Sequence, residues 1–218
     1  MDRTGLVVAI SSISGGGKST VVRELVNQLD DAVAIYFDDY ETPETYPKSP
    51  AAIVGDGADF NEVKSPLLAQ HLCSLKNGEP ITSPKSGMVV QPAKIIVFEG
   101  PLGRAQQETG QYIDYLVFID TPLEVGLARR FSRSLGNADI ESMSKDELQN
   151  QLKNVQWLAD NYLLWMRDAY LAQLQQVRPD SDVILDWQQA PEALASAIID
   201  ALAEANLRFG DIWARRHI

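Results

Sequence analysis

Short apolar runs alternate along the chain with segments whose apolar residues recur at helical spacing. The apolar runs cover residues 5–10, 32–37, 95–98, 115–119 and 183–185. A run without polar alternation is typical of a parallel strand covered on both faces. Helical spacing covers residues 19–30, 65–77, 145–176 and 191–206, and a further helix begins near residue 122. The pattern predicts an α/β fold, with one domain over residues 1–218 and a doubly wound parallel five-stranded sheet.

Two segments interrupt this alternation. Residues 41–60 contain three prolines and two glycines with little periodicity, which predicts a long functional loop. Residues 79–93 predict an irregular hairpin.

A glycine-rich stretch, SSISGGGKST at residues 11–20, lies between the first strand and the first helix. It ends like the phosphate-binding P-loop pattern G-x-x-x-x-G-K-[ST], with Ser12 in place of the first glycine. In such a loop backbone N–H groups surround the phosphates, the lysine reaches the outer phosphates and the next hydroxyl binds Mg²⁺. A flexible strand–helix turn is the alternative, and the flanking strand and helix argue against it. The predicted nucleotide-binding residues are Ser14, Gly15, Gly16, Gly17, Lys18, Ser19 and Thr20, and Lys18 is also predicted to be catalytic.

Ser12 itself is expected to carry a small cost. If its position requires a positive φ, a residue other than glycine loses about 1 kcal/mol there.

Acidic residues follow three of the predicted strands: Asp38-Asp39, Glu99 and Asp120. Ligands of open α/β sheets bind beyond the carboxyl ends of the strands. Carboxylates there can hold Mg²⁺ or accept the proton of a hydroxyl that attacks a phosphoryl group. We therefore predict Asp38 and Glu99 as catalytic residues and, with Ser19, as metal ligands. Asp120 precedes Thr-Pro and is predicted to mark a helix start.

Arg129, Arg130 and Arg133 lie on the helix after Asp120, and the spacing places Arg129 and Arg133 on one face. A solvated basic face is one interpretation. The other is a lid over about 129–145 whose arginines close over the phosphates, with Arg129 and Arg133 catalytic and Arg130 nucleotide-binding.

Composition narrows the classes of protein that fit. A formal net charge of −11 argues against a nucleic-acid-binding surface. One cysteine and two histidines leave no disulfide framework or His-rich zinc site, and the cysteine usage indicates a cytoplasmic protein. The sequence shows neither a signal peptide nor an apolar run long enough to cross a membrane.

The ordered set of motifs resembles one family. The P-loop, the Asp-Asp-aromatic strand end, "ADF", "VFEG", "DTPLEVGLARR" and the late "DVIL" strand are similar to the uridine kinase and nicotinamide riboside kinase group, with phosphoribulokinase and bacterial pantothenate kinase as relatives. The resemblance runs from about residue 5 to residue 187. It implies a P-loop kinase with a helical lid that uses ATP and Mg²⁺ to phosphorylate a hydroxyl of a nucleoside or similar small metabolite.

The resemblance also implies residue roles. Lys18 and Ser19 match the phosphate and magnesium ligands, Asp38 the catalytic aspartate, and Glu99 an acid near metal and acceptor. The three arginines match lid arginines. The predicted substrate-binding residues are Asp39, Tyr40, Asp59 and Phe60.

Three features depart from the family pattern. Ser12 replaces glycine, Glu41 stands where a second aromatic is usual, and the hairpin at 79–93 is shorter than in uridine kinases. Together these departures argue against uridine as the acceptor and leave ATP use intact. Two other functions stay open at this point: an NTPase or nucleotide-binding regulator without a small-molecule acceptor, and a non-catalytic binding module. The oligomeric state is also open, and a homodimer is compatible with the sequence.

Overall fold

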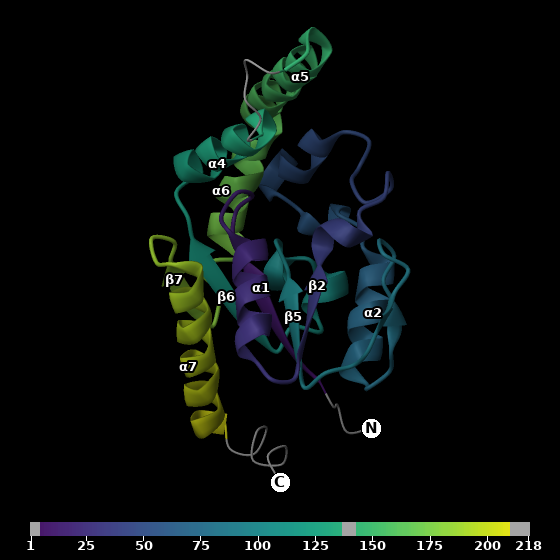
Figure 1. Ribbon diagram of the computed structural model, residues 1–218, viewed down its shortest axis with the longest axis vertical. Coiled ribbons are helices and arrows are strands. Elements are labelled where there is room, and N and C mark those ends of the chain that lie inside the picture. Colours follow the sequence, from purple (N-terminus) through teal and green to yellow (C-terminus); the bar gives the residue numbers. More distant parts are fainter. Residues whose placement is uncertain (1–4, 137–142, 210–218) are drawn as a thin grey trace.

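The computed structural model describes residues 5–136 and 143–209, and its centre is a five-stranded parallel sheet (Figure 1). The strand order is β2-β5-β1-β6-β7, and every neighbouring pair is parallel. The strands are β1 Leu6–Ser11, β2 Ala32–Tyr36, β5 Ile95–Glu99, β6 Tyr115–Asp120 and β7 Val183–Asp186. The predicted doubly wound five-stranded sheet is confirmed.

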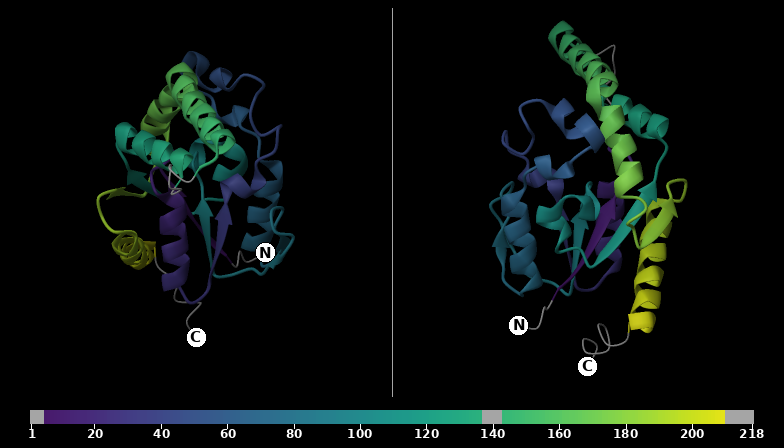
Figure 2. Two further views of the ribbon diagram at one scale, coloured as in Figure 1. Left: turned by 45° about the horizontal axis from the view of Figure 1, so that its top comes forward. Right: turned by 180° about the vertical axis from the view of Figure 1, so that it is seen from behind.

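Helices cover both faces of the sheet (Figure 2). One buried cluster joins alternate residues of β1 to α1 (Lys18–Gln28) and α7 (Pro191–Phe209). The other joins the remaining β1 residues to α2 (Pro66–Lys76) and α6 (Arg167–Gln176). Because successive side chains of a strand point to opposite faces, a fully apolar strand fills both clusters.

The two irregular segments carry short elements. The path from β2 to α2 contains three 3₁₀ turns, η1 Phe37–Tyr40, η2 Pro50–Gly57 and η3 Phe60–Glu62, so the predicted loop at 41–60 is partly helical. The predicted hairpin is confirmed as the antiparallel pair β3 Ile81–Thr82 and β4 Val89–Val90. After β5 the chain forms η4 Gly103–Ala105 and the short helix α3 Gln107–Gly110.

The helix predicted over 145–176 is a continuous helical path made of three parts. They are α5 Lys145–Asn161, a π-helical segment η6 at Tyr162–Met166, and α6. We call these three parts the rod. Its α5 end projects from the top of the molecule beside α4, Leu123–Leu135 (Figure 1). The predicted lid at 129–145 comprises the end of α4 and the start of α5, and its residues 137–142 lie outside the described residues.

Among the described residues, the helices include none with the length and apolar character needed to cross a bilayer.

Candidate functional site

The glycine-rich stretch forms a tight loop between the end of β1 and the start of α1. Gly15 and Gly17 have φ values of +82° and +97°, which favour glycine. A Cβ atom on Gly15 would lie 2.4 Å from the backbone oxygen of Gly126 in α4. The loop therefore requires glycine both for its backbone conformation and for the close approach of α4. The loop places the N-terminus of α1 at the carboxyl end of β1. Backbone N–H groups at a helix N-terminus can bind an anion there.

Ser12 has a structural role that the sequence did not predict. Its Oγ donates to the backbone oxygen of Ile119 at 2.7 Å and lies 3.5 Å from Thr121 Oγ1. Thr121 in turn donates to the backbone oxygen of Gly16 at 3.2 Å. Among residues 5–136 and 143–209, Ala58 alone of the non-glycine residues has a positive φ. The expected strain at Ser12 is therefore wrong, because this serine fastens the P-loop to the end of β6 without a left-handed backbone.

Lys18 is buried at the start of α1, with 8% of its surface exposed. Its Nζ donates to the backbone oxygens of Ser12 and Ile13, both at 3.1 Å. Burial lowers the pKa of Lys18, and the negative charges of Glu99 and Asp38 oppose that shift. The lysine is thus held against the P-loop, close to both predicted catalytic acids.

Glu99 and Ser19 form a hydrogen-bonded pair beside this lysine. Ser19 Oγ donates to Glu99 Oε1 at 3.0 Å, and Glu99 is 5% exposed. Burial raises the pKa of Glu99, whereas the charge of Lys18 and the Ser19 hydrogen bond lower it. The structure therefore brings Lys18, Ser19 and Glu99 together, and Asp38 is close enough for its charge to affect both Lys18 and Glu99.

Ser19 and Glu99 offer a hydroxyl and a carboxylate oxygen, which are suitable ligands for Mg²⁺. Mg²⁺ prefers oxygen ligands and is usually held by one or two carboxylates together with substrate phosphates. Within the described ranges, His, Cys, Asp and Glu side chains form no group of three that could hold a metal ion. A magnesium ion at Ser19 and Glu99 would therefore complete its ligand shell with water or phosphate oxygens.

The three arginines of α4 all lie near the P-loop. Arg129 Nη1 donates to the backbone oxygen of Gly15 at 3.3 Å, and its guanidinium lies 5.1 Å from the ring centroid of Trp187. Arg130 donates to the hydroxyl of Tyr170 in α6. The charges of Arg133 and Arg130 both lower the pKa of Lys18. Arg129 and Arg133 are exposed and Arg130 is half-buried, so the lid stays a prediction.

Asp38 and Asp39 follow β2 in η1 and have different surroundings. Asp38 is exposed. Burial raises the pKa of Glu41, and the nearby negative charge of Asp38 also raises it. Asp39 Oδ1 accepts from Lys85 Nζ at 2.6 Å, so it is paired with the hairpin between β3 and β4. Glu41 also accepts a hydrogen bond from Tyr46.

Of the other predicted substrate-binding residues, Tyr40 and Phe60 are buried, whereas Asp59 is exposed. Tyr40 is buried in the core, and its hydroxyl lies 2.9 Å from His71 Nδ1 in α2. Burial and the charge of Asp39 raise the pKa of Tyr40 to about 12. Phe60 is 2% exposed in the same cluster. Asp59 accepts from the backbone N of Asn61 at 2.9 Å and caps η3. Tyr40 and Phe60 thus form the core below the strand ends, because large rings are most stable when buried.

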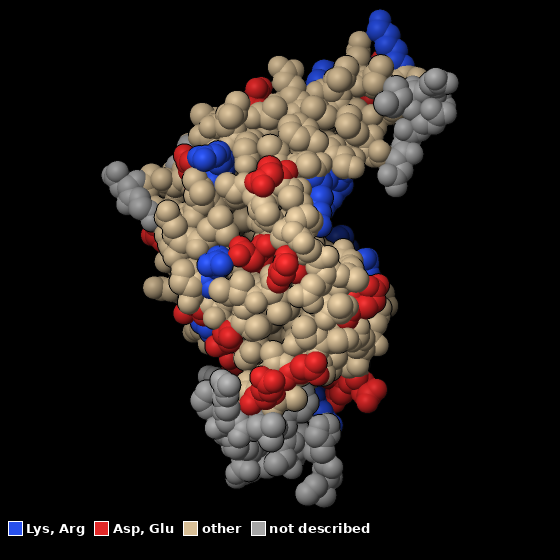
Figure 3. Space-filling view, turned by 90° about the vertical axis from the view of Figure 1, so that its left-hand side faces the viewer, with Lys and Arg blue, Asp and Glu red and all other residues tan. Residues whose placement is uncertain are grey.

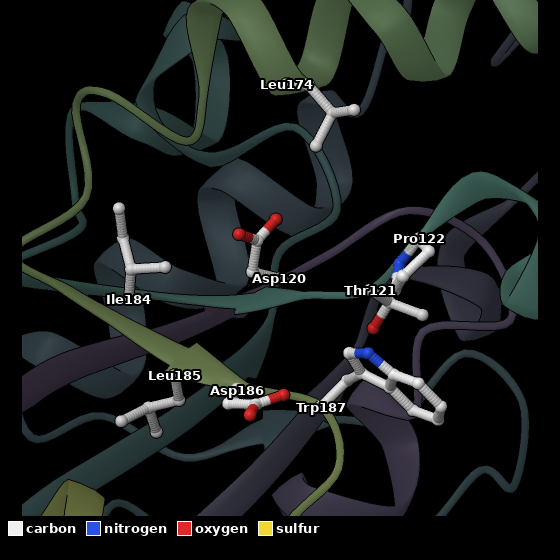
Figure 4. Close-up of a pocket in the computed structure, with 8 residues that line it drawn as sticks. All are labelled: Asp120, Thr121, Pro122, Leu174, Ile184, Leu185, Asp186 and Trp187. Atoms are coloured by element: carbon white, nitrogen blue, oxygen red, sulfur yellow. The ribbon is translucent and has the colours of Figure 1, made fainter.

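A pocket of about 500 Å³ opens at the carboxyl ends of β6 and β7. Trp187 lies beside Thr121, and Leu174 faces Asp120 from α6 (Figure 4). Asp120 does not cap α4, since its carboxylate accepts from Arg178 Nη2 at 2.9 Å. Trp187 was missed in the sequence because a lone tryptophan after a short strand carries no motif. Its contact with Arg129 makes it part of the site.

Charge is unevenly distributed over the surface. In this view acidic side chains form scattered groups over the body, and a few Lys and Arg side chains lie at the hollow below the upper part of the molecule (Figure 3). Arg129 provides a cation at the P-loop through its contact with Gly15.

Comparison with known proteins agrees with this geometry. No protein-family model matches the chain. The uridine kinase of Histophilus somni (strain 2336) is 25% identical over 200 residues, which cover 84% of this chain and 88% of the relative. The uridine kinase of Haemophilus influenzae (strain PittGG) is 25% identical over 196 residues, covering 83% and 86%. The predicted resemblance to uridine kinases is confirmed.

The solved structure of a shikimate kinase shows the same fold. The shikimate kinase of Acinetobacter baumannii, in complex with shikimate, superposes with a TM-score of 0.53 at 14% identity, covering 94% of this chain and 97% of that chain. A possible uridine kinase from Bacillus stearothermophilus has a TM-score of 0.42 at 15% identity, covering 85% and 91%.

Proposed function

We propose that this chain is an ATP-dependent kinase that transfers the γ-phosphoryl group to a hydroxyl of a nucleoside or similar small metabolite. The similarity to uridine kinases over most of the chain supports a phosphotransferase with a hydroxyl acceptor. The observation that carries the proposal is the hydrogen bond between Ser19 and Glu99 beside the buried Lys18. A phosphate-binding lysine, a metal-binding hydroxyl and an acid from the neighbouring strand are the parts that phosphoryl transfer requires.

The surroundings of the two acids suggest a division of roles. Glu99 is buried and accepts a hydrogen bond from Ser19, which suits a carboxylate that would hold Mg²⁺ together with Ser19. Asp38 is exposed at the end of β2, which suits a base that takes the proton of the acceptor hydroxyl. Backbone N–H groups of residues 14–20 would bind the triphosphate. Lys18 with Arg129, Arg130 and Arg133 would neutralise charge as the phosphoryl group moves. When bound, Mg²⁺ supplies further positive charge to the phosphate oxygens.

The decisive experiment is an ADP-release screen across nucleosides, vitamin precursors and sugar acids. We expect ADP release to depend on an added acceptor. Asp38→Asn should lower kcat by about 10²–10⁴-fold, the range that general base catalysis contributes, with an unchanged thermal midpoint. Asp31→Asn is the matched control, because this exposed carboxylate directly precedes β2 and so lies at the opposite end of the strand from Asp38. Equal kcat in wild type and Asp38→Asn would refute the role of Asp38. ATP consumption that needs no added metabolite would indicate an NTPase instead.

A further inference from the structure

Gln173 of α6 is a buried amide in which one of the two polar atoms has a hydrogen-bond partner and the other has none among the described residues. It is 5% exposed, and its Nε2 donates to the backbone oxygen of Pro101 at 2.7 Å. Its Oε1 is the buried side-chain oxygen that has no partner among the described residues. A buried acceptor without a donor destabilises a fold, so its presence calls for an explanation.

The bond that Gln173 makes fixes the turn behind Glu99. Pro101 is the second residue after Glu99, and its carbonyl oxygen also accepts from Ser11 Oγ at 2.9 Å. The backbone N of Gly100 donates to the oxygen of Ile10 at 3.1 Å. Donors from β1 and from α6 therefore hold the segment whose last strand residue carries the Ser19-bound carboxylate.

The same helix contacts the predicted lid. Tyr170 accepts from Arg130 and lies three residues before Gln173, on the same side of α6. One turn of α6 thus touches an arginine of α4 and the turn after β5.

We propose that Gln173 is a positioning residue that sets the Glu99 carboxylate through its bond to Pro101. The assignment rests on the proposed function only for its effect on turnover. The unpartnered Oε1 lowers the stability of the fold. This loss is explained if Gln173 serves the position of Glu99 and not the stability of α6.

The test compares Gln173→Met with a matched control, Gln176→Met. Gln176 lies on the same helix and also donates its amide to a backbone oxygen, that of Ala58 at 2.9 Å, away from Glu99. Methionine has a similar length and removes both the bond and the unpartnered oxygen. Pro101 keeps Ser11 as a donor, so we expect an unchanged or higher thermal midpoint for Gln173→Met. In the ADP-release assay its kcat should fall about 10–100-fold, as for loss of an outer-shell partner, while the KM for ATP stays near the wild-type value.

A readout without turnover separates this inference from the proposed function. The protein is labelled with ¹³C-carboxyl glutamate, and the Glu99 signal is assigned from a Glu99→Gln sample. At one fixed pH, the carboxyl ¹³C chemical shift of Glu99 should change in Gln173→Met and stay unchanged in Gln176→Met. If wild type releases no ADP with any acceptor but this chemical shift changes, the kinase proposal fails and the positioning role stands. An unchanged chemical shift overturns the role, as does a loss of kcat that the unfolded fraction of Gln173→Met fully accounts for.

Discussion

Replacing Lys18 with methionine should separate activity from stability. The substitution removes two charged hydrogen bonds, to the oxygens of Ser12 and Ile13 at 3.1 Å. Hydrogen bonds to charged groups contribute about 1.5–3 kcal/mol each. The substitution also removes the desolvation penalty of a buried ion, which is on the order of several kcal/mol. These opposing effects are of similar size, so the free energy of unfolding should change by less than about 2 kcal/mol.

The effect of Lys18→Met on catalysis should be much larger. Loss of one preorganised donor to developing charge typically lowers kcat about 10²–10³-fold, or roughly 2.7–4 kcal/mol of transition-state stabilisation. The assay is ADP release at saturating acceptor, with the thermal midpoint measured on the same samples.

Lys76 offers a matched buried lysine outside the site. Its Nζ donates to the backbone oxygen of Tyr112 at 2.9 Å and pairs with Asp114. Lys76→Met should destabilise the fold by roughly 3 kcal/mol, because it leaves Asp114 partly buried without this cation, and kcat should not change. The reasoning is refuted if Lys18→Met keeps wild-type kcat, or if it loses as much stability as Lys76→Met.

Three further predictions follow from the site and its surroundings. Because burial raises the pKa of Glu99, the acid limb of kcat/KM should lie above pH 4.5, and activity should fall as pH drops through that raised value. Ser19→Ala removes a hydrogen bond that lowers this pKa, so the limb in its residual activity should move to higher pH. In Gly126→Ala the new Cβ would lie 2.9 Å from the backbone oxygen of Ser14 in the P-loop. Although alanine favours helices over glycine by about 1 kcal/mol, we expect a lower thermal midpoint and weaker ATP binding by calorimetry. A raised midpoint with unchanged affinity would contradict this prediction. Tyr40→Phe should cost about 1 kcal/mol of stability through its lost contact with His71 and leave the acceptor KM unchanged, whereas a raised KM would support substrate binding by Tyr40.

The sequence predicted what depends on neighbouring residues. Continuous apolar runs identified all five strands of the sheet, and the motif placed Lys18 and Ser19 at a helix start. The bond from Ser12 to Ile119 spans 107 residues, and that from Lys85 to Asp39 spans 46, so no local pattern indicates them.

The sequence pattern also did not predict the short or irregular helical turns. The 3₁₀ turns within 41–60 are too short to show a period. The apolar pattern of 145–176 continues through the π-helical segment, so the sequence predicted an ordinary α-helix there.

That π-helical segment, Tyr162–Met166, fixes the phase of everything that follows it in the rod. A π turn takes up an extra residue within a helical path, and each α-helical residue rotates the next by about 100°. Because the π turn absorbs that residue, α6 keeps the phase in which Tyr170 contacts Arg130 and Gln173 contacts Pro101. A one-residue deletion should therefore be tolerated within this segment, because it converts the π turn to an α turn and keeps both contacts.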